Sequence, residues 1–149
     1  MPIFSGEFDH RVDSQGRVAI PAKFRAAFAN GIVLTRGYDP CIVAHTPDKW
    51  ELFAADVAAL PPTQARIRKL ARLTFSGAYP ADPDRQGRVV IPGPLREYAG
   101  ISEEAVLVGV GTNMEIWAID RWDNERANLD KHASQIAENV TVVGLPNNS

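Results

Sequence analysis

The sequence predicts an α+β fold, mainly β, that is built from two copies of one small module. The first observation is an internal repeat: residues 4–25 and 75–96 align at a constant offset of 71, with eleven of 22 positions identical. The second is the order of signals in each copy, which reads strand, glycine turn, strand, helix. The third is size, because a half of roughly 70 residues is only marginally stable alone by surface-to-volume scaling. We therefore expect the halves to share a core.

The repeated motif reads D-x-Q-G-R-x-x-I-P-x-x-x-R and begins at Asp13 in the first copy and at Asp84 in the second. These aspartates open a turn, and their carboxylates can accept backbone amide protons as in Asx turns. The glycine of each motif, Gly16 or Gly87, suits a tight turn because glycine takes positive φ without a clash. The motif thus predicts a rigid turn followed by a short β-branched strand.

An arginine follows each turn glycine, Arg17 in the first copy and Arg88 in the second. Each arginine could form a salt bridge with its own motif aspartate, and exposed pairs of that kind contribute only about 0–1 kcal/mol. Alternatively, the planar guanidinium suits phosphate groups and guanine edges. The residues alone leave the two interpretations equal.

The other elements follow from apolar periodicity, turn residues and proline positions. The first half is expected to contain strands at residues 3–12, 18–20, 31–36 and 41–45, the last two as a hairpin, with helices at residues 22–29 and from Pro47 through Val57. The second half is expected to contain strands at residues 89–91, 105–110 and 114–119, the last two again as a hairpin, with helices at residues 95–99 and 121–138. The corresponding organisation is a first module at residues 1–60, a connecting basic helix at 61–74, a second module with a C-terminal helix at 75–140, and a loose tail at 141–149.

The connecting helix, residues 64–73, is the most basic run in the chain. It carries Arg66, Arg68, Lys69 and Arg72, and no acidic residue lies between Asp56 and Asp82. Such a run is either a solvated helix face or a contact with DNA or another subunit. The sequence leaves both interpretations open.

Charge is distributed unevenly along this chain of net charge −2. Residues 1–100 carry 13 basic and 10 acidic side chains, whereas residues 101–149 carry 3 and 8. A basic face in the first two thirds is therefore compatible with binding to nucleic acid. The chain shows no signal peptide and no apolar run of membrane-spanning length, and Cys41 is its single cysteine, so a cytoplasmic location is expected.

Catalytic and metal-binding patterns are not apparent. His10, His45 and His132 are scattered, and no cysteine or carboxylate stands at metal-ligand spacing from them. No Ser-His-Asp or G-x-S-x-G arrangement is visible. We therefore expect neither an enzyme nor a metal site, and no cofactor or small-molecule substrate.

The two motif copies, each preceded by F-S-G, resemble the MraZ family over roughly residues 1 to 140. The resemblance implies two tandem AbrB/SpoVT-type swapped-hairpin β-barrel modules with flanking helices. It further implies a sequence-specific, nucleoid-associated DNA-binding regulator of the bacterial division and cell-wall gene cluster. Family members bind short direct repeats in their own promoter as ring-shaped homo-oligomers, so double-stranded DNA and further copies of the chain are the expected partners.

The resemblance also favours DNA contact for the motif arginines. The expected DNA-binding residues are Arg11, Gln15, Arg17, Lys23 and Arg88, with Asp13, Gly16, Asp84 and Gly87 forming the turns. The first copy is expected to be the main contact, because acidic side chains and prolines surround the second. The alternative is an antitoxin-like protein of this fold whose main partner is another protein, which two complete modules and a short tail disfavour.

Overall fold

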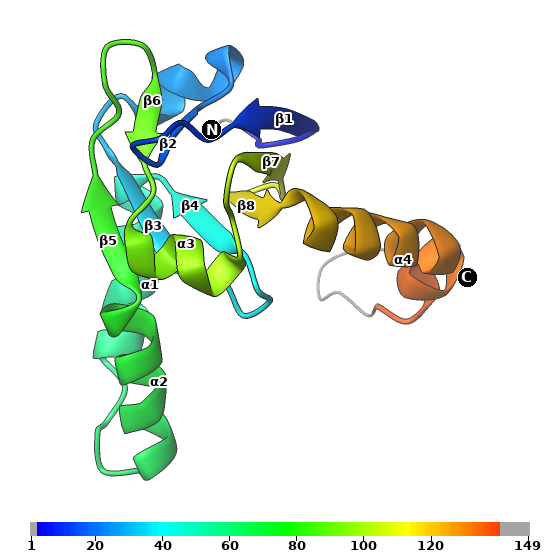
Figure 1. Ribbon diagram of the computed structural model, residues 1–149. Coiled ribbons are helices and arrows are strands. Elements are labelled where there is room, and N and C mark those ends of the chain that lie inside the picture. Colours follow the sequence, from blue (N-terminus) through cyan, green and yellow to red (C-terminus); the bar gives the residue numbers. More distant parts are fainter. Residues whose placement is uncertain (1–2, 141–149) are drawn as a thin grey trace. The chain divides into compact units, whose positions relative to one another are not determined.

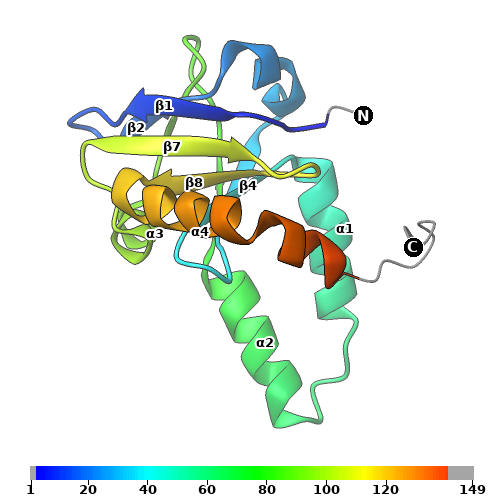
Figure 2. The same cartoon turned by 90° about the vertical axis from the view of Figure 1, so that its right-hand side faces the viewer.

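The computed structural model describes residues 3–140 of the 149 residues as an α+β protein. The chain divides into two units, Met1–Ile119 and Asp120–Ser149. Figures 1 and 2 show the elements of both units. The strands are β1 (Glu7–Arg11), β2 (Arg17–Ala19), β3 (Ile32–Arg36), β4 (Ile42–His45), β5 (Ala78–Ala81), β6 (Arg88–Val90), β7 (Glu104–Gly109) and β8 (Met114–Ala118). The helices are the 3₁₀ helix η1 (Ala22–Phe28) and the α-helices α1 (Pro47–Ala58), α2 (Ala65–Ser76), α3 (Gly93–Ala99) and α4 (Ile119–Glu138).

Six strands form one antiparallel sheet in the order β1-β7-β8-β4-β3-β5. The hairpins β3–β4 and β7–β8 confirm the pairing expected from the sequence. The first strand of each repeat instead pairs with the other repeat: β1 pairs with β7, and β5 pairs with β3. The sheet therefore has a pseudo-twofold arrangement with β8 and β4 at its centre, and β1, β7 and β8 can be followed side by side in Figure 2.

The remaining two strands, β2 and β6, form a separate two-stranded antiparallel ribbon. These are the strands that follow the two motif turns, so this pairing also joins the two repeats. Within residues 3–140 the strands lie in an open six-stranded sheet and a ribbon, and no sheet closes on itself. The swapped pairing agrees with the tandem swapped-hairpin architecture, although the strands are not arranged as two separate barrels.

One hydrophobic core serves both repeats. It includes an aromatic cluster in which Phe4 lies 5.0 Å from Phe24 and 5.4 Å from Phe28, measured between ring centroids. From the second repeat it receives residues such as Ile91 and Leu95, which are 1% exposed. Since neither repeat encloses this core alone, the expectation of a shared core is confirmed.

Several element bounds differ from the sequence expectation. The first strand is shorter than residues 3–12, and Phe4 makes only an isolated bridge with Gly111. The F-S-G repeat is extended in the first copy but ends α2 in the second, where Phe75 and Ser76 are helical. Thr46 precedes α1 as expected, but its hydroxyl makes no capping hydrogen bond to the helix. The tail expected at residues 141–149 lies outside the described residues.

Candidate nucleic-acid interface

The two motif turns have the same hydrogen bonds. In the first copy, Asp13 Oδ1 accepts hydrogen bonds from the amides of Gln15 at 3.0 Å and Arg17 at 2.8 Å. In the second, Asp84 Oδ1 accepts from the amides of Gln86 and Arg88, both at 2.9 Å. The turn glycines have φ of 77° and 75°, which is the left-handed region that favours glycine. Each aspartate thus fixes the backbone that leads into β2 or β6.

The same aspartates hold the motif arginines. Arg17 Nε donates to Asp13 Oδ2 at 2.7 Å, and Arg88 Nε donates to Asp84 Oδ2 at 2.9 Å. Within residues 3–140, the hydrogen bonds that these guanidinium groups donate use Nε only. The salt bridge and a role in recognition are therefore compatible: the carboxylate fixes one edge of the guanidinium and leaves the other edge available.

The pKa values of Asp13 and Asp84 lie below the ordinary value for aspartate because both carboxylates accept hydrogen bonds. Hydrogen bonding by the Arg17 amide is the largest cause of the lowered pKa of Asp13, and the Arg88 amide has the same effect on the pKa of Asp84. The guanidinium hydrogen bonds add to the lowering in both cases. Both carboxylates are consequently ionised at neutral pH, which keeps the arginines oriented.

The ribbon brings Arg17 and Arg88 onto one surface. Arg17 is opposite Val90 and Arg88 is opposite Ala19, so the two arginines lie in the first and last of the three residue pairs of the ribbon. Side chains alternate between faces along a strand, and Val18 and Val89 are each 1% exposed on the inner face. The arginines therefore share the outer face, offset by roughly two residues or 7 Å along the strands. A two-stranded ribbon of this width fits the major groove of B-DNA.

Each turn is also covered by the last arginine of the other motif. Arg96 Nη1 lies 2.8 Å from the position of a Cβ on Gly16, and Arg25 Nε occupies the corresponding place beside Gly87. Backbone hydrogen bonds cross in the same way, from the Ile20 amide to the Gly87 carbonyl at 2.8 Å. The structure places Arg25 at the turn of the other repeat, because β2 and β6 pair with each other. The only available signal was that both motifs end in arginine.

The other predicted DNA-binding residues lie close to the first turn in the chain, and all are exposed. Arg11 ends β1 opposite Glu104, and Gln15 lies at the tip of the turn. Lys23 lies on η1, where its Nζ is 5.2 Å from the ring centroid of Phe8 and 4.9 Å from that of Phe24. Cation–π contacts at exposed sites are weak, about 0.5–1 kcal/mol, so Lys23 remains available to a phosphate.

Two other properties of the described residues bear on function. No three His, Cys, Asp or Glu side chains among residues 3–140 are grouped so as to hold a metal ion. None of the helices described is both long enough and apolar enough to cross a membrane.

The fold and the site define a tandem-repeat α+β protein in which each Asp–Arg turn leads into one strand of a ribbon shared by the two repeats. The family described as "MraZ protein, putative antitoxin-like" matches the chain twice, over residues 3–73 and 74–144. The chain belongs to the MraZ family.

Relatives named "Transcriptional regulator MraZ" are similar over almost the whole chain. The relative from Syntrophomonas wolfei is 43% identical over 143 residues, which is 96% of this chain and 100% of the relative. The one from Herpetosiphon aurantiacus is 44% identical over the same shares. The one from Roseiflexus sp. strain RS-1 is 42% identical over 93% of this chain and 96% of its own length.

Proposed function

We propose that this protein is a sequence-specific DNA-binding transcriptional regulator. The observation that carries the proposal is the outer face of the β2–β6 ribbon, where an aspartate fixes Arg17 and Arg88 through Nε. The free edge of a guanidinium so held matches the O6 and N7 acceptors of guanine in the major groove. The relatives' printed name, "Transcriptional regulator MraZ", is consistent with this role.

We further propose that its target is a set of repeats in its own promoter, within the bacterial division and cell-wall gene cluster. The protein would act in the cytoplasm at the nucleoid, as a ring-shaped homo-oligomer. Support comes from family membership and from the modest charge of one copy, which is net −2 overall. A ring places several ribbons along one DNA molecule, and linked sites gain affinity through effective concentration without new contacts.

Both motif copies belong to the proposed DNA-binding surface. Arg17 and Arg88 stand on the same ribbon face, so the second copy is not expected to be a silent one. Arg11, Gln15 and Lys23 would add contacts around the first turn. The basic face of α2 is a separate surface, whose part in DNA binding stays open.

The first prediction concerns the ribbon arginines. Arg17→Ala and Arg88→Ala should each weaken binding to the protein's own upstream DNA by about 1–3 kcal/mol, as expected for loss of a base-edge contact. Lys131→Ala, which removes one exposed positive charge from α4, is the matched control and should bind normally. Gel-shift titrations, with circular dichroism to check folding, provide the measurement. Unchanged affinity in both folded arginine variants would refute the assignment.

The family description also contains the term antitoxin-like, which supports an antitoxin-like protein as the second candidate function. A protein of that kind would use a protein partner as its main ligand. The two functions predict different effects of losing Arg17. A DNA-binding regulator would lose affinity for its DNA, whereas an antitoxin-like protein would still bind its protein partner. Footprinting of the upstream region, compared between wild type and Arg17→Ala, separates them.

A further inference from the structure

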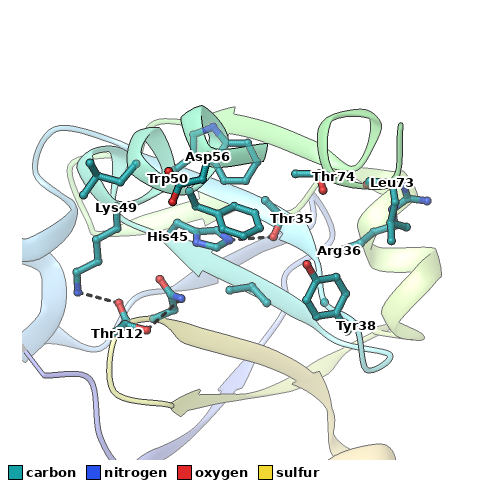
Figure 3. Close-up of a pocket in the computed structure, with 15 residues that line it drawn as sticks. Thr35, Arg36, Tyr38, His45, Lys49, Trp50, Asp56, Leu73, Thr74 and Thr112 are labelled. Atoms are coloured by element: carbon teal, nitrogen blue, oxygen red, sulfur yellow. Dashed lines mark hydrogen bonds between the residues drawn. The ribbon is translucent and has the colours of Figure 1, made fainter. Parts of the chain in front are cut away.

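A hollow of about 590 Å³ lies between α1, α2, the β3–β4 hairpin and the β7–β8 turn (Figure 3). Aromatic rings form much of its wall: the centroid of Trp50 is 5.4 Å from that of His45 and 5.9 Å from that of Phe53. Some polar groups in the wall are bonded within the protein, for example Lys49 Nζ to the Thr112 carbonyl at 2.9 Å, whereas Arg36 Nε and Asn113 Oδ1 are buried without a hydrogen-bond partner among the described residues. The aromatic part of the wall favours a mainly apolar occupant.

The rim of this hollow leaves large apolar side chains in solvent. Tyr38 is 78% exposed, Leu52 70%, Leu73 46% and Phe53 39%. Single exposed apolar residues are ordinary, but a contiguous patch beside an apolar hollow is typical of a surface that meets a partner.

A matching apolar surface occurs in α4, in the other unit. Leu129 and Ile136 are 37% and 42% exposed, and Ala133 stands between them. Spacings of four and three residues place such side chains on one face of a helix. The backbone leaves helical geometry at His132, so the face after this point is carried by Ala133 and Ile136.

The two surfaces also have opposite charge. Residues 47–76, which contain α1 and α2, carry five basic and three acidic side chains. Residues 119–138, which form α4, carry three basic and five acidic ones. Complementary charge steers encounter and disfavours wrong partners, while the apolar surfaces supply the contact area.

We propose that the apolar face of α4 from a second copy of this chain docks in the hollow formed by α1, α2 and the β3–β4 hairpin. This deepens the proposed function, since it rests on self-assembly and names the surfaces that join the copies. The two surfaces differ, so the contact is heterologous: it continues from copy to copy and closes into a ring if the rotation allows.

Variants with one added cysteine test the contact directly. Leu52→Cys places a thiol at the rim and Ile136→Cys places one on α4, while native Cys41 is 1% exposed and burial raises its pKa, so it does not compete. The full-length variants are mixed, treated with diamide as oxidant and separated on a non-reducing gel. We expect a disulfide-linked dimer from this mixture and none from either variant alone. Val90→Cys, at a 52% exposed position on the β2–β6 ribbon, replaces Ile136→Cys in the control mixture and should give no dimer.

The outcomes decide between occupants. A Leu52→Cys, Ile136→Cys double variant is treated in the same way. A disulfide that forms within one chain of this double variant but never between the mixed variants would overturn the proposal, as would no disulfide at all. Light scattering provides a second measurement: Leu52→Asp or Ile136→Asp should reduce the particle to single chains, and Val90→Asp should not. None of these measurements involves DNA. A cross-linked dimer that does not bind the upstream repeats would therefore refute the proposed function without contradicting the proposed contact.

Discussion

Gly87 meets two steric demands at once. Its φ of 75° lies in the left-handed region, and Arg25 Nε from the other motif lies where a Cβ would be. We predict that Gly87→Ala costs about 1–2 kcal/mol from the backbone conformation alone, with more from displacing Arg25. Gly93, in the first turn of α3, has neither constraint and is the control. Gly93→Ala should leave the free energy of unfolding in urea unchanged or slightly higher.

A Gly87→Ala variant as stable as wild type would show that the turn can move away from Arg25. The same comparison at Gly16, beside Arg96, would show whether the two turns are equivalent.

The motif aspartates make stability depend on acidic pH. Both pKa values are lowered in the folded state from the ordinary value of 3.8, so their stabilising effect is complete above pH 3.8 and is lost as the pH falls through the folded pKa. We predict that the urea midpoint of the wild type falls more steeply below pH 3.8 than that of the Asp13→Asn, Asp84→Asn double variant. Asp130→Asn, an exposed change in α4, should keep the wild-type slope. Equal slopes in all three proteins would contradict the prediction.

Residue types made the turns predictable but not their surroundings. Aspartate and glycine at fixed spacing specify local hydrogen bonds, so the roles of Asp13 and Gly16 could be inferred from sequence. The position of Arg25 could not, because it depends on which strand β2 pairs with. The pairing of β2 with β6 depends on packing in the shared core, and local sequence propensities do not predict that packing.

At the scale of elements, the ribbon depends on two buried valines. Val89 is 1% exposed on the inner face, whereas its neighbour Val90 is 52% exposed on the outer face. We predict that Val89→Ala lowers the free energy of unfolding by about 2 kcal/mol, since it removes a fully buried side chain. Val90→Ala should stay within about 0.5 kcal/mol of wild type. Chemical denaturation measures both, and equal losses would mean that the ribbon faces are wrongly assigned.

The elements that the sequence predicted best are those whose partners are adjacent in the chain. The β3–β4 and β7–β8 hairpins follow from alternating apolar runs around turn residues. The pairing of β1 and β5 with strands of the other repeat could not be predicted from local sequence, because an edge strand of the same composition could pair with a strand of either repeat. Pro80 in β5 fits such an edge position, since proline lacks the amide proton that a central strand would need.

At the scale of the whole molecule, the two repeats are interdependent. Strands β1, β2 and β3 of the first repeat pair with β7, β6 and β5 of the second. We predict that a fragment of residues 1–74 does not fold as a monomer, and that adding a fragment of residues 75–149 restores native circular dichroism and cooperative unfolding.

Because the repeats are alike, the first fragment has one other way to satisfy its strands, which is to pair with a second copy of itself. Light scattering separates this swapped dimer from a monomer. A monomeric fragment with a cooperative thermal transition would contradict the interdependence.

The pairing of β1 with β7 has a consequence for synthesis on the ribosome. Glu7 pairs with Val108 and Arg11 with Glu104, so the partner of the first strand is made about 100 residues later. At roughly 5–20 residues per second, β1 leaves the exit tunnel many seconds before its partner exists. The nascent chain must keep this strand unpaired until β7 emerges, and on a polysome the nearest competing strand belongs to the neighbouring nascent chain.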